Sequence, residues 1–193
     1  QTLIHQTAIA MENARLFDQV QSALTETSVL YRTSGSLIAQ EHLPDVLQAV
    51  VDGVIEALPA DRATVITMDL EREMVTDFVK GGPGADHIVS PSFEELWSGL
   101  TGWVLRNMQP ALSPKGEPDP REGVEARRVR EETECGSIIV VPLVYRDKPL
   151  GTMTAINRPD QREFAEKDVD LLMAFANQAA AALENARLIE ESQ

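Results

Sequence analysis

Apolar positions recur along the chain at two spacings, one typical of strands and one typical of helices. Four short runs rich in β-branched residues, at 63–70, 74–80, 137–145 and 150–156, are expected to be strands. The polar turns 71–73 and 146–149 join them into two antiparallel hairpins. The second hairpin is apolar on nearly every residue, so we expect it at the centre of a sheet with both faces covered.

Five stretches show helical spacing, namely 1–39, 43–58, 93–108, 124–132 and about 165–193. The second is expected to open at Leu43 and Pro44, because proline is tolerated in a first helical turn. Gly99 and Gly102 interrupt the third. A short strand is expected at 109–112, and the loop 114–123, rich in proline, glycine and charge, is expected to be mobile. Hairpins with helices at both ends predict an α+β domain with a mainly antiparallel sheet.

A repeated segment connects the two ends of the chain. QTAIAMENARL at 6–16 matches QAAAALENARL at 178–188. We expect residues 1–30 to be a connector helix from a preceding domain of the same type, and 31–193 to be one unit of a tandem array, ending in a signalling helix at about 165–193. Chance similarity of two Ala-rich helices is the alternative, and the continuous ENARL makes it the weaker one.

The last helix carries a stripe at alternating spacings of three and four, which is typical of a seam against a partner helix. The residues of this stripe are Leu172, Phe175, Ala179, Ala182, Ala186 and Ile189. We expect this stripe to hold a parallel homodimer together.

Composition narrows the classes of partner. The 193 residues carry a net charge of −14, which argues against nucleic acid and against an anionic membrane surface. No apolar run approaches the roughly 20 residues of a membrane span. A single cysteine, Cys135, excludes an internal disulfide framework and fits a reducing compartment, so we expect a cytoplasmic protein without membrane contact.

Four motifs together resemble those of a GAF domain. They are GLTGWVLRNMQP at 99–110, SIIVVPL at 137–143, PLGTMTAIN at 149–157, and Phe164 followed by the helix through NQAA at 177–180. The resemblance implies an antiparallel sheet of about six strands, with the terminal helices on one face and short helices and loops over a pocket on the other.

The resemblance also implies a ligand pocket. The residues expected to line it are Thr67, Phe78, Trp97, Trp103, Ser137, Thr152 and Thr154. Thr152 and Thr154 are expected to share a face, because side chains alternate along a strand. The alternative for each of these residues is an ordinary place in the core, satisfied by backbone or water.

The motifs of known GAF subclasses fit only in part. Asn157, Arg158, Phe164 and Asp168 resemble the structural signature of cyclic-nucleotide-binding members, but Val169 stands where a glutamate would end it. That signature implies an ion pair between Arg158 and Asp168, which supports the fold more than a nucleotide ligand.

Other cofactors fit less well. Cys135 lies several residues too late for a covalent bilin, and one cysteine is insufficient for reduction of methionine sulfoxide. His5, His42 and His87 lack the spacing of a metal site, so we expect no metal, and the cofactor stays unknown.

These observations predict a non-catalytic regulatory domain of a larger signalling protein, with no catalytic residues of its own. A small molecule would bind in the pocket, and the terminal helices of the dimer would pass the change to an output domain, such as a two-component kinase or a cyclase. The alternative is a ligand-free GAF spacer that serves only for dimerisation. An enzyme is disfavoured, because no nucleophile and base pairing can be named.

Overall fold

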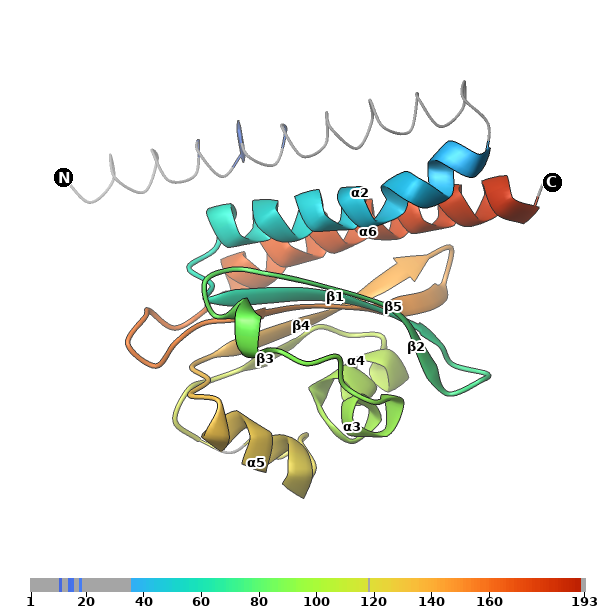
Figure 1. The fold of residues 1–193 in the computed structure, drawn as a ribbon. Helices are drawn as coiled ribbons and strands as arrows, with labels where there is room; N and C mark the ends of the chain where they lie inside the picture. The colour runs from blue at the N-terminus through green and yellow to red at the C-terminus, as the bar shows by residue number, and fades with distance from the viewer. Residues whose placement is uncertain (1–10, 12–13, 16–17, 19–35, 118, 192–193) are drawn as a thin grey trace.

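The computed structural model describes residues 11, 14–15, 18, 36–117 and 119–191. Its centre is a five-stranded antiparallel sheet in the order β2-β1-β5-β4-β3 (Figure 1). The strands are β1 (Arg62–Asp69), β2 (Met74–Gly81), β3 (Ala111–Ser113), β4 (Ile138–Tyr145) and β5 (Lys148–Ile156). The expected α+β class is confirmed, and the described residues contain five strands where the family resemblance implied about six.

The β4–β5 hairpin forms because of its local sequence. Arg146 and Asp147 have φ angles of 46° and 65°, which suit a two-residue turn whose twist matches that of the strands. The two strands that this turn joins are rich in apolar residues and mostly buried, as expected for a central position. Because β1 pairs with β5, the first hairpin extends the sheet on that side.

Two long helices cover one face of the sheet, namely α2 (Ser36–Ala57) and α6 (Glu166–Glu191) (Figure 1). Val51 of α2, Phe175 of α6 and Met153 of β5 are fully buried in the core between these helices and the sheet. The expected start of a helix at Leu43 is wrong. The α2 helix begins at Ser36 and includes Pro44, which removes one backbone donor without ending the helix.

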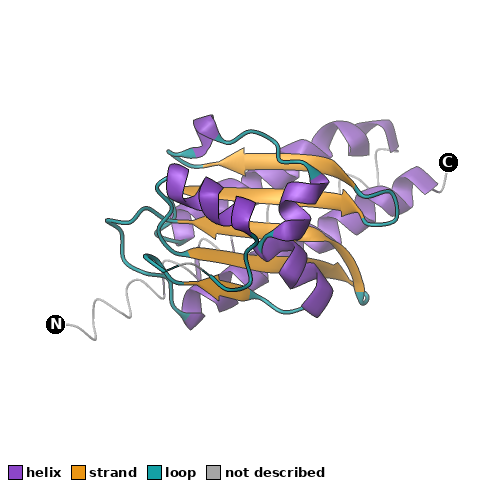
Figure 2. Cartoon of the chain, turned by 90° about the horizontal axis from the view of Figure 1, so that it is seen from below, coloured by secondary structure: helices purple, strands orange, loops and turns teal. Residues whose placement is uncertain are grey.

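The other face carries the short helices α3 (Phe93–Ser98), α4 (Leu100–Asn107) and α5 (Val124–Glu132) (Figure 2). The expected helix 93–108 is divided at Gly99, whose extended backbone ends α3 and precedes α4. At Gly102 a Cβ atom would lie 2.0 Å from the carbonyl oxygen of Trp97, so only glycine allows the two helices to pack this closely. A short 3-10 helix, Ala85–His87, follows β2.

The stripe on α6 does not form an exposed seam. Leu172, Phe175 and Ala179 are fully buried in the core of their own chain, and Ala186 is 4% exposed. Ala182 is half-buried, and the side chain of Ile189 lies outside the described residues. The stripe therefore packs within the chain, because a helix that covers a sheet needs an apolar face just as a helix in a dimer does. Within the described residues, no helix has the length and apolar character needed to cross a membrane.

Candidate functional site

The sheet face opposite α2 and α6 carries a row of threonines. Thr154 on β5 lies directly opposite Thr64 on β1, and Thr152 lies opposite Ile66, so these side chains share one face. We call Thr64, Thr152 and Thr154 the threonine row. All three are buried, and the hydroxyl of Thr152 is fully buried without a hydrogen-bond partner. Sequence analysis predicted the shared face of Thr152 and Thr154 but missed Thr64.

Apolar clusters flank the threonine row on both sides. One is formed by Ile66, Met68 and Leu105, with Phe78 and Trp97 packed against it. The other lies between α4 and strands β3 and β4, and Trp103 packs against it. Three of the predicted pocket residues, Phe78, Trp97 and Trp103, therefore belong to the walls around the threonine row, and each is partly exposed.

The two tryptophans carry cations on their rings. The guanidinium of Arg106 lies 4.9 Å from the ring centre of Trp97, and that of Arg121 lies 5.0 Å from the ring centre of Trp103. Trp97 also stacks on Phe93 at 5.4 Å. These contacts hold both rings in place beside the row.

Thr67 is not brought to this face. It alternates with Ile66 and therefore lies on the same side as Val65, toward the long helices. Its hydroxyl donates to the carboxylate of Asp77 at 2.5 Å and lies 2.6 Å from the hydroxyl of Thr76. These contacts explain Thr67 as a residue that links β1 to β2.

Ser137 is also placed elsewhere, in a buried polar knot. Its hydroxyl accepts a hydrogen bond from the backbone N–H of Phe164 at 3.0 Å. The side chain of Asn157 accepts from the Ser137 N–H at 2.7 Å and donates to the carbonyl of Arg162 at 2.6 Å. Ser137, Asn157 and Phe164 thus tie the start of β4 to the end of β5 and to the segment before α6.

The predicted ion pair between Arg158 and Asp168 is wrong. Asp168 accepts two hydrogen bonds from the guanidinium of Arg162, at 2.7 and 2.8 Å, and Arg158 instead pairs with the exposed Asp160. Burial alone would raise the pKa of Asp168, but the bonds from Arg162 and from the N–H of Ala165 outweigh it and lower the pKa. The carboxylate still anchors the first turn of α6, with a different arginine.

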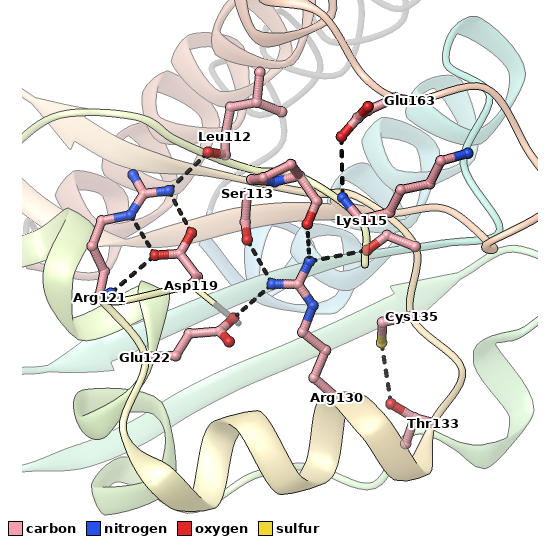
Figure 3. A network of polar contacts seen from close by, with 12 residues as sticks. Leu112, Ser113, Lys115, Asp119, Arg121, Glu122, Arg130, Thr133, Cys135 and Glu163 are labelled. Atoms are coloured by element: carbon pink, nitrogen blue, oxygen red, sulfur yellow. Dashed lines mark hydrogen bonds and ion pairs between the residues drawn. The ribbon is translucent and has the colours of Figure 1, made fainter. Parts of the chain in front are cut away.

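A second polar cluster lies between β3 and α5, and sequence analysis missed it (Figure 3). The guanidinium of Arg130 donates to the hydroxyl of Ser113 at 2.5 Å, to the carbonyl of Gly136 at 3.1 Å and to the carbonyl of Pro114. It also lies 3.3 Å from the carboxylate of Glu122. We call these contacts of Arg130 the Arg130 clasp.

Two carboxylates of this cluster, both buried, are satisfied to different degrees. Asp119 pairs with Arg121 through two side-chain bonds of 2.9 and 2.7 Å, and these bonds lower the pKa of Asp119. Burial raises the pKa of Glu122, and the attraction of Arg130, which acts in the opposite direction, does not outweigh it. The second carboxylate oxygen of Glu122, Oε2, has no hydrogen-bond partner. Asp119 is thus fully paired, and Glu122 is not.

The segment 114–123, expected to be mobile, is held by this cluster and by Lys115. The ammonium of Lys115 donates to the carbonyls of Pro159 and Gln161, and its backbone N–H donates to Glu163. In the sequence, the opposite charges within this segment are the one feature that could have indicated these ion pairs. Composition alone does not distinguish charges that meet partners from charges that are solvated.

The side chains around the threonine row include hydroxyls, aromatic rings and one thiol nearby. In the described part of the chain, no three His, Cys, Asp or Glu side chains gather in a way that would hold a metal ion. The thiol of Cys135 lies 3.4 Å from the guanidinium of Arg62 and 3.1 Å from the hydroxyl of Thr133. The face of the threonine row thus presents hydroxyls between aromatic walls.

A family model of the GAF domain matches residues 42–183. The chain belongs to the GAF domain family. This confirms the resemblance, and GAF domains are a family of regulatory sensor domains that bind small molecules and are generally non-catalytic. The match spans the threonine row, the Arg130 clasp and most of α6.

Solved structures share the GAF fold at low sequence identity. The GAF domain of a phosphoenolpyruvate-protein phosphotransferase from Coxiella burnetii is 18% identical, with a TM-score of 0.68, and the match covers 95% of this chain and 99% of that one. A GAF sensor protein from Burkholderia vietnamiensis is 18% identical, with a TM-score of 0.66, over 93% and 98% of the chains. The free methionine-R-sulfoxide reductase from Neisseria meningitidis, solved in complex with its substrate, is 15% identical, with a TM-score of 0.68, over 91% and 90%.

Proposed function

We propose that this GAF domain is a non-catalytic sensor that binds a small molecule over the threonine row. The observation that carries the proposal is the hydroxyl of Thr152, which is 0% exposed and has no hydrogen-bond partner. An unpaired buried hydroxyl costs about 1–3 kcal/mol, and an acceptor or donor on a ligand would remove that cost. Trp97 and Trp103 supply the apolar walls of such a site.

Family context supports a small-molecule ligand. The Neisseria meningitidis protein of the same fold was solved in complex with its substrate, which shows that a GAF fold accommodates a small molecule. A cyclic nucleotide is one candidate, although Asn157 and Asp168, which raised it, serve here to anchor the backbone.

The signal would leave the domain through α6. This helix packs on α2, on β4 and on β5, and β5 carries Thr152 and Thr154 of the threonine row. A shift of the hairpin on binding would therefore move α6 directly, provided that α6 has two arrangements of similar energy. We propose that a parallel homodimer passes this shift to flanking GAF and output domains of the same polypeptide.

The repeated segment supports a preceding domain. In α6, Leu183 is 9% exposed and Ala186 is buried, because this face packs on its own domain. The corresponding residues of the N-terminal copy are exposed, with Met11 at 71% and Ala14 also exposed. Exposed residues at positions whose copies in α6 are buried suit a connector whose own domain precedes it in the polypeptide.

Native mass spectrometry tests the sensor proposal. The domain is purified from a cellular source and weighed under native and denaturing conditions, as wild type and as Thr152→Val. We expect a retained small molecule on the wild type and its loss from Thr152→Val. The control is Thr67→Val, a buried threonine on the opposite face, which should keep the molecule.

The spacer alternative makes the opposite prediction. If the residues around the threonine row only pack against one another, the purified wild type carries no small molecule. Thr152→Val then raises the free energy of unfolding, because valine removes an unpaired hydroxyl at nearly constant volume. A bare wild type together with a stabilised Thr152→Val would overturn the sensor proposal.

A further inference from the structure

The α5 helix differs from the other helices in how it is held. None of its described side chains is buried, and Val124 is 83% exposed. None of the three apolar clusters that surround the sheet includes a residue of α5. Among the described apolar side chains of α5, only Ala126 is half-buried, beside Gly99, so polar contacts contribute much of what fixes the position of this helix.

Those polar contacts are few and concentrated. The Arg130 clasp joins α5 to Ser113 at the end of β3, to Pro114, to Glu122 and to Gly136 before β4 (Figure 3). At the other end of α5, the N–H of Gly123 donates to the carbonyl of Ser98 at 2.9 Å. Among the described contacts of α5, those of the Arg130 guanidinium reach four residues outside the helix.

The Arg130 clasp holds α5 close to the threonine row. The α5 helix lies on the sheet face that carries the threonine row, on the same side as α3 and α4 (Figures 1 and 2). The turn before it places Arg121 on the ring of Trp103, which is a wall of the row. Any movement of the turn and α5 together would uncover that wall.

We propose that residues 119–132 form a cover that opens as one unit over the threonine row, and that the Arg130 clasp is its latch. The unit ends just before Glu134, whose φ of 51° is the left-handed conformation common where a helix ends. Within the clasp, the second oxygen of Glu122 is buried without a hydrogen-bond partner. Arg127, Asp119 and Arg121 supply the remaining charges around Glu122.

The role of the cover in ligand entry rests on the proposed function, but its opening does not. The test therefore uses the protein alone, so that either proposal can fail without the other. Amide hydrogen exchange, followed by mass spectrometry on peptides, compares α5 with the β4–β5 hairpin. Segments that open locally exchange at lower free energy than the core.

We expect the amides of α5 to exchange faster than those of β4 and β5 in the wild type. Arg130→Gln should accelerate exchange in α5 by roughly tenfold to a hundredfold and leave the hairpin unchanged. The matched control is Arg128→Gln on the same helix, which alters an exposed pair with Glu132 and should change little.

A double variant distinguishes the loss of the Arg130 contacts from the effect of leaving Glu122 buried without a cation. Arg130→Gln leaves the buried Glu122 without its cation, so Arg130→Gln with Glu122→Gln removes both charges. We expect the double variant to open faster than wild type as well. Equal protection of α5 and the hairpin in the wild type, equal acceleration of both by Arg130→Gln, or wild-type exchange in the double variant would each overturn the proposal.

Discussion

Replacing Asn157 by alanine tests the polar knot that closes the central hairpin. Asn157 is fully buried, and its amide makes two hydrogen bonds, at 2.7 Å from the Ser137 N–H and at 2.6 Å to the Arg162 carbonyl. Asn157→Ala would leave the Ser137 N–H buried and unpaired, and it would remove the donor to the part-buried carbonyl of Arg162. The buried orphan costs about 1–3 kcal/mol and the second lost bond about 1 kcal/mol, so the free energy of unfolding should fall by about 2–4 kcal/mol.

Urea unfolding followed by circular dichroism measures this loss, with the midpoint compared at constant slope. Because domains are stable by only about 5–15 kcal/mol, Asn157→Ala could unfold outright, and Ser137→Ala then serves as the milder variant. It removes only the acceptor for the Phe164 N–H and should cost about 1–3 kcal/mol.

Gln161→Ala is the control, because its contact with the Arg158 N–H lies in an exposed part of the same loop. It should change stability by less than about 0.5 kcal/mol. A loss from Asn157→Ala no larger than that from Gln161→Ala would refute the reasoning, since it would mean that water satisfies the groups that Asn157 pairs.

Three further predictions follow from single observations. Burial raises the pKa of Glu122, so the folded state binds this proton more tightly than the unfolded state does. The free energy of unfolding of the wild type should therefore fall as pH rises from the ordinary glutamate range through the raised pKa. Glu122→Gln should remove this slope from unfolding curves measured between pH 4 and 8, and an unchanged slope would contradict the prediction. Gly102→Ala should destabilise the domain by more than about 1 kcal/mol in thermal melts, because its Cβ meets the backbone of Trp97. If α6 lies in the dimer, Asn177→Cys in a cysteine-free background should crosslink two chains, because Asn177 is exposed. Leu172→Cys should not crosslink, because Leu172 is fully buried. The reverse result would support the predicted dimer contact through the stripe of α6.

The elements that local chemistry decides were predicted well. The strands at 137–145 and 150–156 follow from β-branched apolar runs around a polar turn, and they agree with β4 and β5. The α5 helix was predicted with the bounds it has, Val124–Glu132. The shared face of Thr152 and Thr154 followed from alternation alone. Each of these depends on neighbours in sequence, which a single chain displays directly.

The choices between distant partners came only with the tertiary structure. Asp168 meets Arg162 rather than Arg158, because the turn after β5 directs Arg158 toward Asp160. The stripe of α6 faces its own sheet, since spacing shows that a helix has an apolar face but not what covers it.

The same limit applies to the site. Thr67 and Thr152 are similar residues in similar strands, and only the register of β1 against β5 places them on opposite faces. Arg130 is one of many charges in an acidic chain, and only the fold brings it to Ser113 and Glu122. Pairing across the sheet and burial of charge depend on contacts between segments far apart in sequence, and these contacts decide where this protein has a site.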